Sequence, residues 1–437
     1  MYHSILRPSG QRQLKNIGEA DLVIGLPTFK NGPAAAHVAR TALAGAHHYY
    51  PALRTVLINA DAGHEAATRR AVAAQAANNG SRDMVVTSRY EGLLGQGSAT
   101  AAILDAALAL DAKAMVILDS QTQTITPNWL AGLAHLILED KADLVTSRYR
   151  WSWPYGALSD LIVYPLFRAL WGWSVRHPAA PDFALSPRLA AAILDEDIWE
   201  TEVATFGLPP WLATYALLGP WRVAQSALGE KQLFPVLPSA RTRQAEKRAI
   251  QRQTAQWQTQ FQTVVSAMLR LVYDYQQHWL DVSTFDSLST LTEFVSPLTS
   301  SAARSLTASE VDPAPLLDDL ALGWMEYRLL WQQILTPINL ASIEALAALP
   351  PDLFYFPADL WARIVYDFAV VFNKGECDPS QVVSSLWPLY QGRLAAFGQE
   401  VAGLSVVGYE GTVAAQAVEF EETRSYLKDR WQAYQSV

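Results

Sequence analysis

Asp119 is the residue whose type and position point most directly to chemistry. It follows a continuous apolar run, Ala114 to Leu118, which is typical of a strand buried on both faces. Packing does not explain a carboxylate at the end of such a run, because a buried carboxylate needs a partner or a cation. We therefore predict that Asp119 belongs to a ligand or metal site, together with Ser120 and Gln121, which follow it.

Three other segments place polar groups or glycines at the ends of apolar runs. Asp61 could accept hydrogen bonds from a ribose or a base edge, or cap the helix that follows it. Lys30 supplies a cation after another run, in a segment that by itself would be an ordinary turn between a strand and a helix. Gly95, Gln96 and Gly97 open a further helix, which alone is a weak indication of an anion site. The four segments in this order are a more specific indication of a ligand site than any one of them alone.

The elements that must position these residues follow from the spacing of apolar residues. Between residues 21 and 138 the chain alternates four times between a short apolar run and an Ala-rich amphipathic stretch, and Asp143 to Arg148 predicts a fifth strand. This alternation predicts a doubly wound, mostly parallel sheet. Ligands bind such sheets outside the carboxyl ends of the strands, where the strand order reverses. We expect the four segments to meet there.

The pattern becomes helical after Pro238. Arg243 to Trp279 carries apolar residues at three- and four-residue spacing without Pro or Gly, which predicts one long helix. The predicted fold class is therefore α/β, with a Rossmann-like domain at residues 18–238 followed by an all-α C-terminal domain at residues 239–437.

Composition excludes several classes of protein. The 437 residues are 50% hydrophobic and only 17% charged, which favours a large core over disorder. The formal net charge of −9 argues against nucleic acid as the main partner. Cys377 is the single cysteine, so neither an internal disulfide nor a cysteine-rich metal site is possible. The low charged fraction thus excludes a disordered or fibrous protein.

The sequence also bears on location and assembly. Residues 1–16 lack the apolar core of a secretory signal, so we expect a cytoplasmic protein. The aromatic-rich stretch from Trp151 to Trp173 contains charged residues and predicts a partly exposed hydrophobic surface rather than a membrane span, which leaves peripheral membrane contact open. Seven of the fifteen tryptophans lie between Trp151 and Trp221, which predicts an interdomain or subunit interface and a homo-oligomer.

Together these motifs resemble those of the GT-A-fold nucleotide-sugar glycosyltransferases, and within them the retaining group of glucosyl-3-phosphoglycerate and mannosylglycerate synthases. The resemblance covers about residues 20–233 and implies a GT-A fold. It is carried by residues 25–27, 59–63, 95–99, 118–121, 147–150, 161–166, 182–186, 206–207, 211–212, 222–225 and 228–229. The helical tail, at residues 386–390 and 420–431, resembles the C-terminal extension of bacterial relatives of this group.

The resemblance implies a donor site for a nucleotide-diphosphate sugar. Leu26, Pro27 and Lys30 would flank the base, and Asp61 would bind its edge. Residues of the two later loops would complete the site; these are Gly95, Gln96, Gly97, Ser120 and Gln121.

It also implies a reaction centre and an acceptor site for glycerate or 3-phosphoglycerate. Asp119 and Asp182 would be catalytic, and Asp119 would be the remaining ligand of a degenerate Mg²⁺ or Mn²⁺ site. The implied acceptor residues are Arg148, Ser159, His177 and Pro181.

Five positions depart from the family pattern, and all of them would contact ligands. Gln96 replaces a phosphate-binding lysine, Gln121 a metal-binding aspartate, and Leu233 a metal-binding histidine. Pro181 replaces a glycine of the acceptor loop, and Pro209 replaces an acidic residue. The lost groups would stabilise the leaving diphosphate, which is commonly the largest catalytic contribution.

Two hypotheses follow from this pattern. The first is a glycosyltransferase, with cationic side chains substituting for the metal. The second is a GT-A-fold pseudoenzyme that binds a nucleotide or serves as a scaffold for a protein partner. The candidate cations are Lys30, Arg148, Arg150, Arg176, His177 and Lys231.

Overall fold

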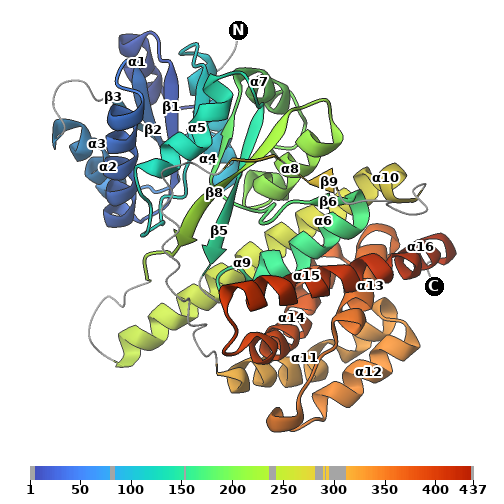
Figure 1. The fold of residues 1–437 in the computed structure, drawn as a ribbon. Coiled ribbons are helices and arrows are strands. Elements are labelled where there is room, and N and C mark those ends of the chain that lie inside the picture. Colours follow the sequence, from blue (N-terminus) through green and yellow to red (C-terminus); the bar gives the residue numbers. More distant parts are fainter. Residues whose placement is uncertain are drawn as a thin grey trace. The chain divides into compact units, whose positions relative to one another are not determined.

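The computed structural model describes residues 5–78, 84–151, 154–235, 243–280, 289–290, 292–294 and 312–434. The chain forms two compact units, each assembled from separate segments (Figure 1). The first comprises Met1–Arg150, Pro178–Gln251 and Leu291–Ser301, and the second Trp151–His177, Arg252–Thr290 and Ala302–Val437.

An eight-stranded sheet forms the centre of the first unit. Its order is β10-β8-β5-β7-β4-β1-β2-β3. Strand β1 is parallel to β2 and β4, β2 to β3, and β10 to β8, whereas β7 is antiparallel to both of its neighbours. The strands are β1 (Leu22–Thr28), β2 (Thr55–Asp61), β3 (Met84–Ser88), β4 (Ala114–Ile117), β5 (Leu144–Trp151), β7 (Phe183–Leu185), β8 (Val223–Lys231) and β10 (Thr292–Phe294).

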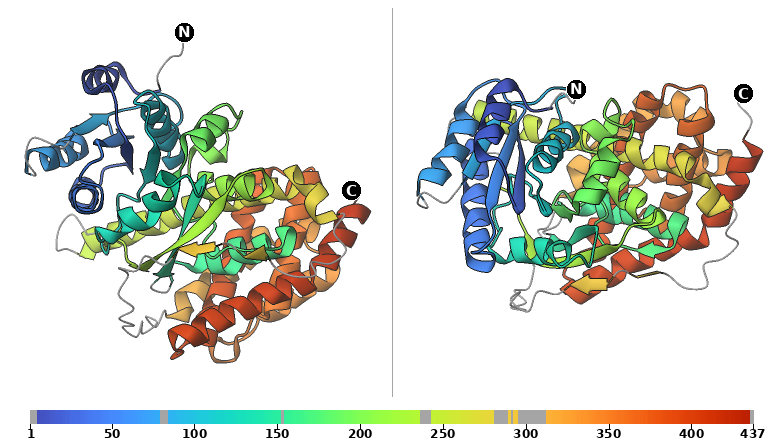
Figure 2. Two further views of the ribbon diagram at one scale, coloured as in Figure 1. Left: turned by 45° about the horizontal axis from the view of Figure 1, so that its top comes forward. Right: turned by 90° about the horizontal axis from the view of Figure 1, so that it is seen from above.

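The burial of β1 shows why the apolar runs form central strands. All seven residues of β1 are buried, so both faces of the sheet are covered by helices at this strand (Figure 2). Gly25 leaves room for two isoleucines, because a Cβ at this position would lie 2.6 Å from Ile103 and from Ile117. The helical segments of this unit are α1 (Pro8–Ile17), α2 (Gly32–Tyr49), α3 (Ala67–Asn78), α4 (Gln96–Leu108), α5 (Asn128–Leu138), α7 (Pro187–Leu194), η2 (Glu202–Ala204), α8 (Leu208–Leu218) and the start of α9 (Arg243–Asp274).

The second unit consists mainly of helices, with one pair of two-residue strands, β6 (Trp173–Ser174) and β9 (Ser289–Thr290). Segments distant in sequence pack together in it. Trp361 donates a hydrogen bond from Nε1 to the carbonyl of Leu161 at 2.7 Å. Its helical segments are the rest of α9 with η1 (Ser159–Val163), α6 (Tyr164–Trp171), α10 (Gln276–Leu280), α11 (Pro313–Ile334), α12 (Pro337–Ala347), η3 (Pro351–Leu353), α13 (Ala358–Lys374), α14 (Pro379–Val401), α15 (Val406–Glu422) and α16 (Arg424–Ala433).

The predicted α/β class is confirmed: a mostly parallel sheet is followed by a helical C-terminal region. The boundary predicted between residues 238 and 239 lies outside the described residues and stays a prediction. The single helix expected from Arg243 to Trp279 is wrong in one respect, because α9 ends at Asp274 and α10 begins at Gln276. Among the described residues, no helix has the length and apolar character needed to cross a membrane.

Candidate functional site

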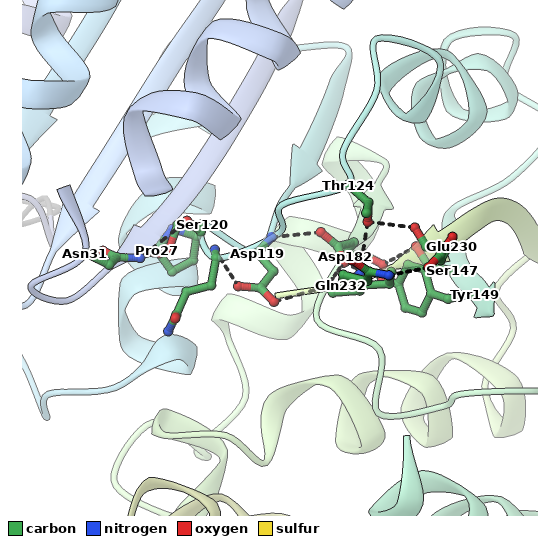
Figure 3. A network of polar contacts seen from close by, with 12 residues as sticks. Pro27, Asn31, Asp119, Ser120, Thr124, Ser147, Tyr149, Asp182, Glu230 and Gln232 are labelled. Atoms are coloured by element: carbon green, nitrogen blue, oxygen red, sulfur yellow. Dashed lines mark hydrogen bonds and ion pairs between the residues drawn. The ribbon is translucent and has the colours of Figure 1, made fainter. Parts of the chain in front are cut away.

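The candidate site lies where the strand order of the sheet reverses. β1 has β2 on one side and β4 on the other, so the loops after β1 and β4 flank this point. Ser120 joins the two loops: its hydroxyl donates to the Pro27 carbonyl at 2.7 Å and accepts from Asn31 Nδ2 at 2.8 Å (Figure 3). Pro27 and Ser120, both predicted nucleotide-binding residues, therefore lie together.

The two predicted catalytic aspartates, Asp119 and Asp182, are in direct contact. The Asp119 backbone N–H donates to Asp182 Oδ1 at 2.8 Å, and Asp119 Oδ1 accepts from the Gln121 backbone N–H at 2.9 Å. The two aspartates meet because Asp182 immediately precedes β7, which pairs with β4. The Asp182 side chain is completely buried, whereas 19% of the Asp119 side chain is exposed. Asp119 is therefore the one of the two that a ligand can reach.

A buried lysine pairs with both carboxylates. Lys231, the last residue of β8, places Nζ 3.1 Å from Asp119 Oδ2 and in contact with Asp182 Oδ2, and its side chain is fully buried. Burial alone would lower the pKa of this ammonium, but Asp119 and Asp182 outweigh it and raise the pKa. Lys231 therefore stays charged at neutral pH.

Two aromatic rings surround the ammonium. The Tyr149 ring lies 4.9 Å from Lys231 Nζ, and Trp129 stacks on Tyr149 with ring centres 5.5 Å apart. The Tyr149 hydroxyl donates to Asp182 Oδ2, and burial raises the pKa of this hydroxyl well above its usual value. Tyr149 is not among the site residues predicted from the sequence. Alternation along the predicted strand was the available signal, because Ser147 also points to Asp182 and donates to its carbonyl at 2.6 Å.

The residues present do not fit a bound Mg²⁺ or Mn²⁺. These ions require several oxygen ligands, most of them carboxylates or waters. Asp119 and Asp182 already share the Lys231 ammonium. No group of three or more His, Cys, Asp or Glu suited to a metal occurs in the part of the chain that the structure describes.

The predicted base-flanking residues differ in exposure. Leu26 and Pro27 are buried at the end of β1, whereas Lys30 is exposed in the loop that follows. Lys30 adopts a left-handed backbone conformation, with φ of 52°, and its Nζ lies 5.1 Å from the centre of the Phe29 ring. The loop therefore presents a cation and an aromatic ring to solvent.

Asp61 is held inside the protein. Its Oδ2 pairs with Arg69 Nη1 at 2.6 Å, and its Oδ1 accepts from the Gly63 N–H at 3.1 Å and from the Thr28 hydroxyl at 3.2 Å. The carboxylate has no exposed surface. These contacts give Asp61 a structural role in this conformation, and its binding to a base edge stays a prediction.

The glycines of the predicted phosphate loop have a packing role. A Cβ at Gly95 would lie 2.3 Å from the Ala204 carbonyl oxygen, and one at Gly97 would lie 1.9 Å from the Val203 carbonyl oxygen. The Gly97 N–H donates to a backbone carbonyl at 2.8 Å, and the Gly95 N–H to the Tyr90 hydroxyl at 3.0 Å. Two N–H groups of the loop therefore donate their hydrogen bonds to other groups of the protein. Gln96 lies between them and is half-buried.

The four predicted acceptor residues fall into both units. Arg148 and Pro181 belong to the first unit and are half-buried. Ser159 and His177 belong to the second, where Ser159 opens η1 and His177 packs edge-on against Trp151, with ring centres 6.2 Å apart. His177 has φ of 57° and is 2% exposed. Their role in acceptor binding stays a prediction.

Comparison with known proteins gave structural matches alone. The sequence matches no protein-family model, and no curated protein matches it. The chain is similar to glucosyl-3-phosphoglycerate synthase from Mycobacterium tuberculosis in complex with Mn²⁺, uridine diphosphate and glucosyl-3-phosphoglycerate; the identity is 18%, the TM-score 0.39, and the match covers 62% of this chain and 86% of that one.

Two further matches are of the same quality. The same synthase with Mn²⁺, UDP-glucose and glycerol 3-phosphate matches at 19% identity and a TM-score of 0.39, covering 62% of this chain and 86% of that one. A mycobacterial protein matches at 17% identity and a TM-score of 0.40, covering 60% of this chain and 78% of that one.

Proposed function

We propose that the protein is a GT-A-type glycosyltransferase that moves a sugar from a nucleotide-diphosphate sugar, of the UDP-glucose or GDP-mannose type, to a small acceptor such as glycerate or 3-phosphoglycerate. One observation carries this proposal. The partly exposed carboxylate of Asp119 lies where the strand order reverses, in a loop that Ser120 ties to the loop after β1. A carboxylate in this place can accept hydrogen bonds from the hydroxyls of a ribose or a sugar.

In the proposed reaction, the bond between the anomeric carbon and the diphosphate breaks, and the diphosphate keeps the electron pair. The acceptor hydroxyl oxygen then forms the new bond on the same face, which retains the anomeric configuration, and its proton passes to the leaving diphosphate. Negative charge gathers on the leaving diphosphate, so a catalyst must stabilise it there. Lys30 is an exposed cation on the neighbouring loop and is the candidate for this role.

A specific observation favours the alternative, a pseudoenzyme that binds nucleotides or a protein partner. Lys231 is fully buried and pairs with both Asp119 and Asp182, so this cluster offers no free cation to a diphosphate. Under this alternative the loops would keep their shape for binding, while transfer would be slow or absent.

Calorimetric titration with UDP-glucose and with GDP-mannose tests the proposal, alongside an assay for release of the nucleoside diphosphate with glycerate or 3-phosphoglycerate added. We expect micromolar binding of one donor and acceptor-dependent release. Binding without release would favour the pseudoenzyme. Absence of binding by any nucleotide sugar would overturn the transferase.

A further inference from the structure

We propose that Lys231 is a built-in counter-cation for Asp119 and Asp182, so that the protein binds no Mg²⁺ or Mn²⁺ at these two carboxylates. The contacts on which this rests are the ion pairs of Lys231 with the two carboxylates. The carboxylates are themselves joined by the hydrogen bond from the Asp119 N–H to Asp182. One ammonium therefore neutralises part of the charge of two carboxylates that lie in direct contact.

The position of the ammonium is fixed by the backbone. The segment that ends β8 pairs with the loop after β4: Thr122 and Leu233 form an antiparallel bridge, and the Gln123 N–H donates to the Gln232 carbonyl at 2.8 Å. The Thr124 hydroxyl donates to the Glu230 carbonyl at 2.8 Å. Lys231 lies inside this paired segment, so its side chain is delivered to the loop that carries Asp119.

Electrostatics explain why a metal would not displace the lysine. The ammonium is fully buried between two carboxylates and lies over the rings of Tyr149 and Trp129, at 4.9 Å and 6.0 Å from their centres. Expelling it would leave a buried charge without its partners, which is strongly unfavourable. A hydrated cation would also find fewer oxygens than it needs, because both carboxylates already have donors.

The consequence for the reaction rests on the proposed function. Lys231 has no exposed surface, so it touches no ligand and is a positioning residue. It orients Asp119 through its ion pair, and the donor binds without a divalent cation. The negative charge of the leaving diphosphate is then stabilised by exposed cations of the surrounding loops.

Metal binding itself can be tested without any reaction. Mn²⁺ titration followed by electron paramagnetic resonance, and Tb³⁺ emission sensitised by Trp129 and Tyr149, should show no site at Asp119 in the unaltered protein. Lys231→Ala leaves two apposed carboxylates without their cation and should gain a site, with Mn²⁺ affinity rising by about tenfold or more. Adding Asp119→Asn to that variant should abolish the gain.

Lys113→Ala is the matched control, because Lys113 pairs with Asp21 at 2.8 Å in an exposed position. It should gain no metal site. If Lys231→Ala fails to fold, as judged by circular dichroism, Mn²⁺ titration of the unaltered protein still tests the proposal. Mn²⁺ bound by that protein and lost in Asp119→Asn would overturn the proposal, and so would a folded Lys231→Ala variant that gains no site.

Donor binding forms a separate arm. The affinity for UDP-glucose or GDP-mannose should be the same within about twofold in excess EDTA and in Mn²⁺. An affinity about tenfold higher in Mn²⁺ would overturn the metal-independent site. If neither donor binds under either condition, the proposed function fails, while the Mn²⁺ titration still tests Lys231.

Discussion

Asp119, Asp61 and Asp182 are three aspartates at strand ends, and the structure separates them by exposure. Asp61 and Asp182 have no exposed surface and are fully engaged with protein partners, whereas 19% of the Asp119 side chain remains exposed. Asp119 is therefore the carboxylate that a ligand can reach, and its orientation is fixed because Lys231 pairs with Oδ2 and the Gln121 N–H donates to Oδ1. Substitution of Asp119 is therefore the most direct test of the site.

Asp119→Asn should reduce transfer by roughly a hundredfold or more, because it removes a charged acceptor while keeping the size of the side chain. The steady-state rate of nucleoside diphosphate release with saturating donor and acceptor measures this. Asp21→Asn is the matched control, because Asp21 precedes the opposite end of β1 and should leave the rate unchanged. A rate for Asp119→Asn close to that of the control would place the reaction elsewhere.

Residue types at strand ends could be predicted from the sequence, but their partners could not. Asp119, Ser120 and Pro27 were placed at one site because parallel strands bring their carboxyl ends together. Asp61 was predicted to face a base, and its partner Arg69 carried no signal, since the ion pair depends on how α3 starts. The glycines at 95 and 97 were assigned to an anion site, although they also admit the close approach of η2, which only three-dimensional packing reveals.

At the scale of elements, the contact between α11 and α14 depends on a glycine. Gly323 of α11 faces Pro388 of α14, and a Cβ at Gly323 would lie 2.2 Å from the Cβ of Pro388. The proline ring cannot move away without moving the α14 backbone. The absence of a side chain at Gly323 therefore sets the distance between these two helices.

Gly323→Ala should destabilise the protein by about 1–3 kcal/mol, because overpacking outweighs the better helix propensity of alanine. Gly411→Ala in α15 is the matched control, since a Cβ there would meet nothing within 4 Å. It should stabilise by up to about 1 kcal/mol. Urea unfolding measures both; equal effects of the same sign would contradict the steric argument.

Strands that coincide with long apolar runs could be predicted from the sequence, whereas very short strands could not. The five expected strands are confirmed as β1 to β5. The three-residue strand β7 has too few residues to give a pattern, and it is a strand because β4 and β5 lie on either side of it. The break between α9 and α10 falls at Tyr275. The sequence around it likewise contains no Pro or Gly that would mark the end of a helix.

For the whole molecule, the assignment of separate chain segments to the two units could not be predicted from the sequence. Residues 151–177 group with the C-terminal helices because contacts distant in sequence hold them there. Arg168 donates to Glu421 at 2.6 Å, and Arg176 pairs with Glu410 at 3.0 Å. Local apolar periodicity carries no information about partners some 250 positions away.

Net charge gives a prediction for the molecule as a whole. The formal charge is −9 at pH 7 and the sequence pI is about 5.4, so mutual repulsion is lost as the pH falls toward that value. Solubility should therefore pass through a minimum near pH 5.4, measured as turbidity between about pH 4 and about pH 8. The exposed apolar side chains of α11, Leu322, Met325 and Leu329, should promote association once repulsion is weak. Turbidity that rises instead toward neutral pH would show that aggregation follows unfolding or a specific contact rather than net charge.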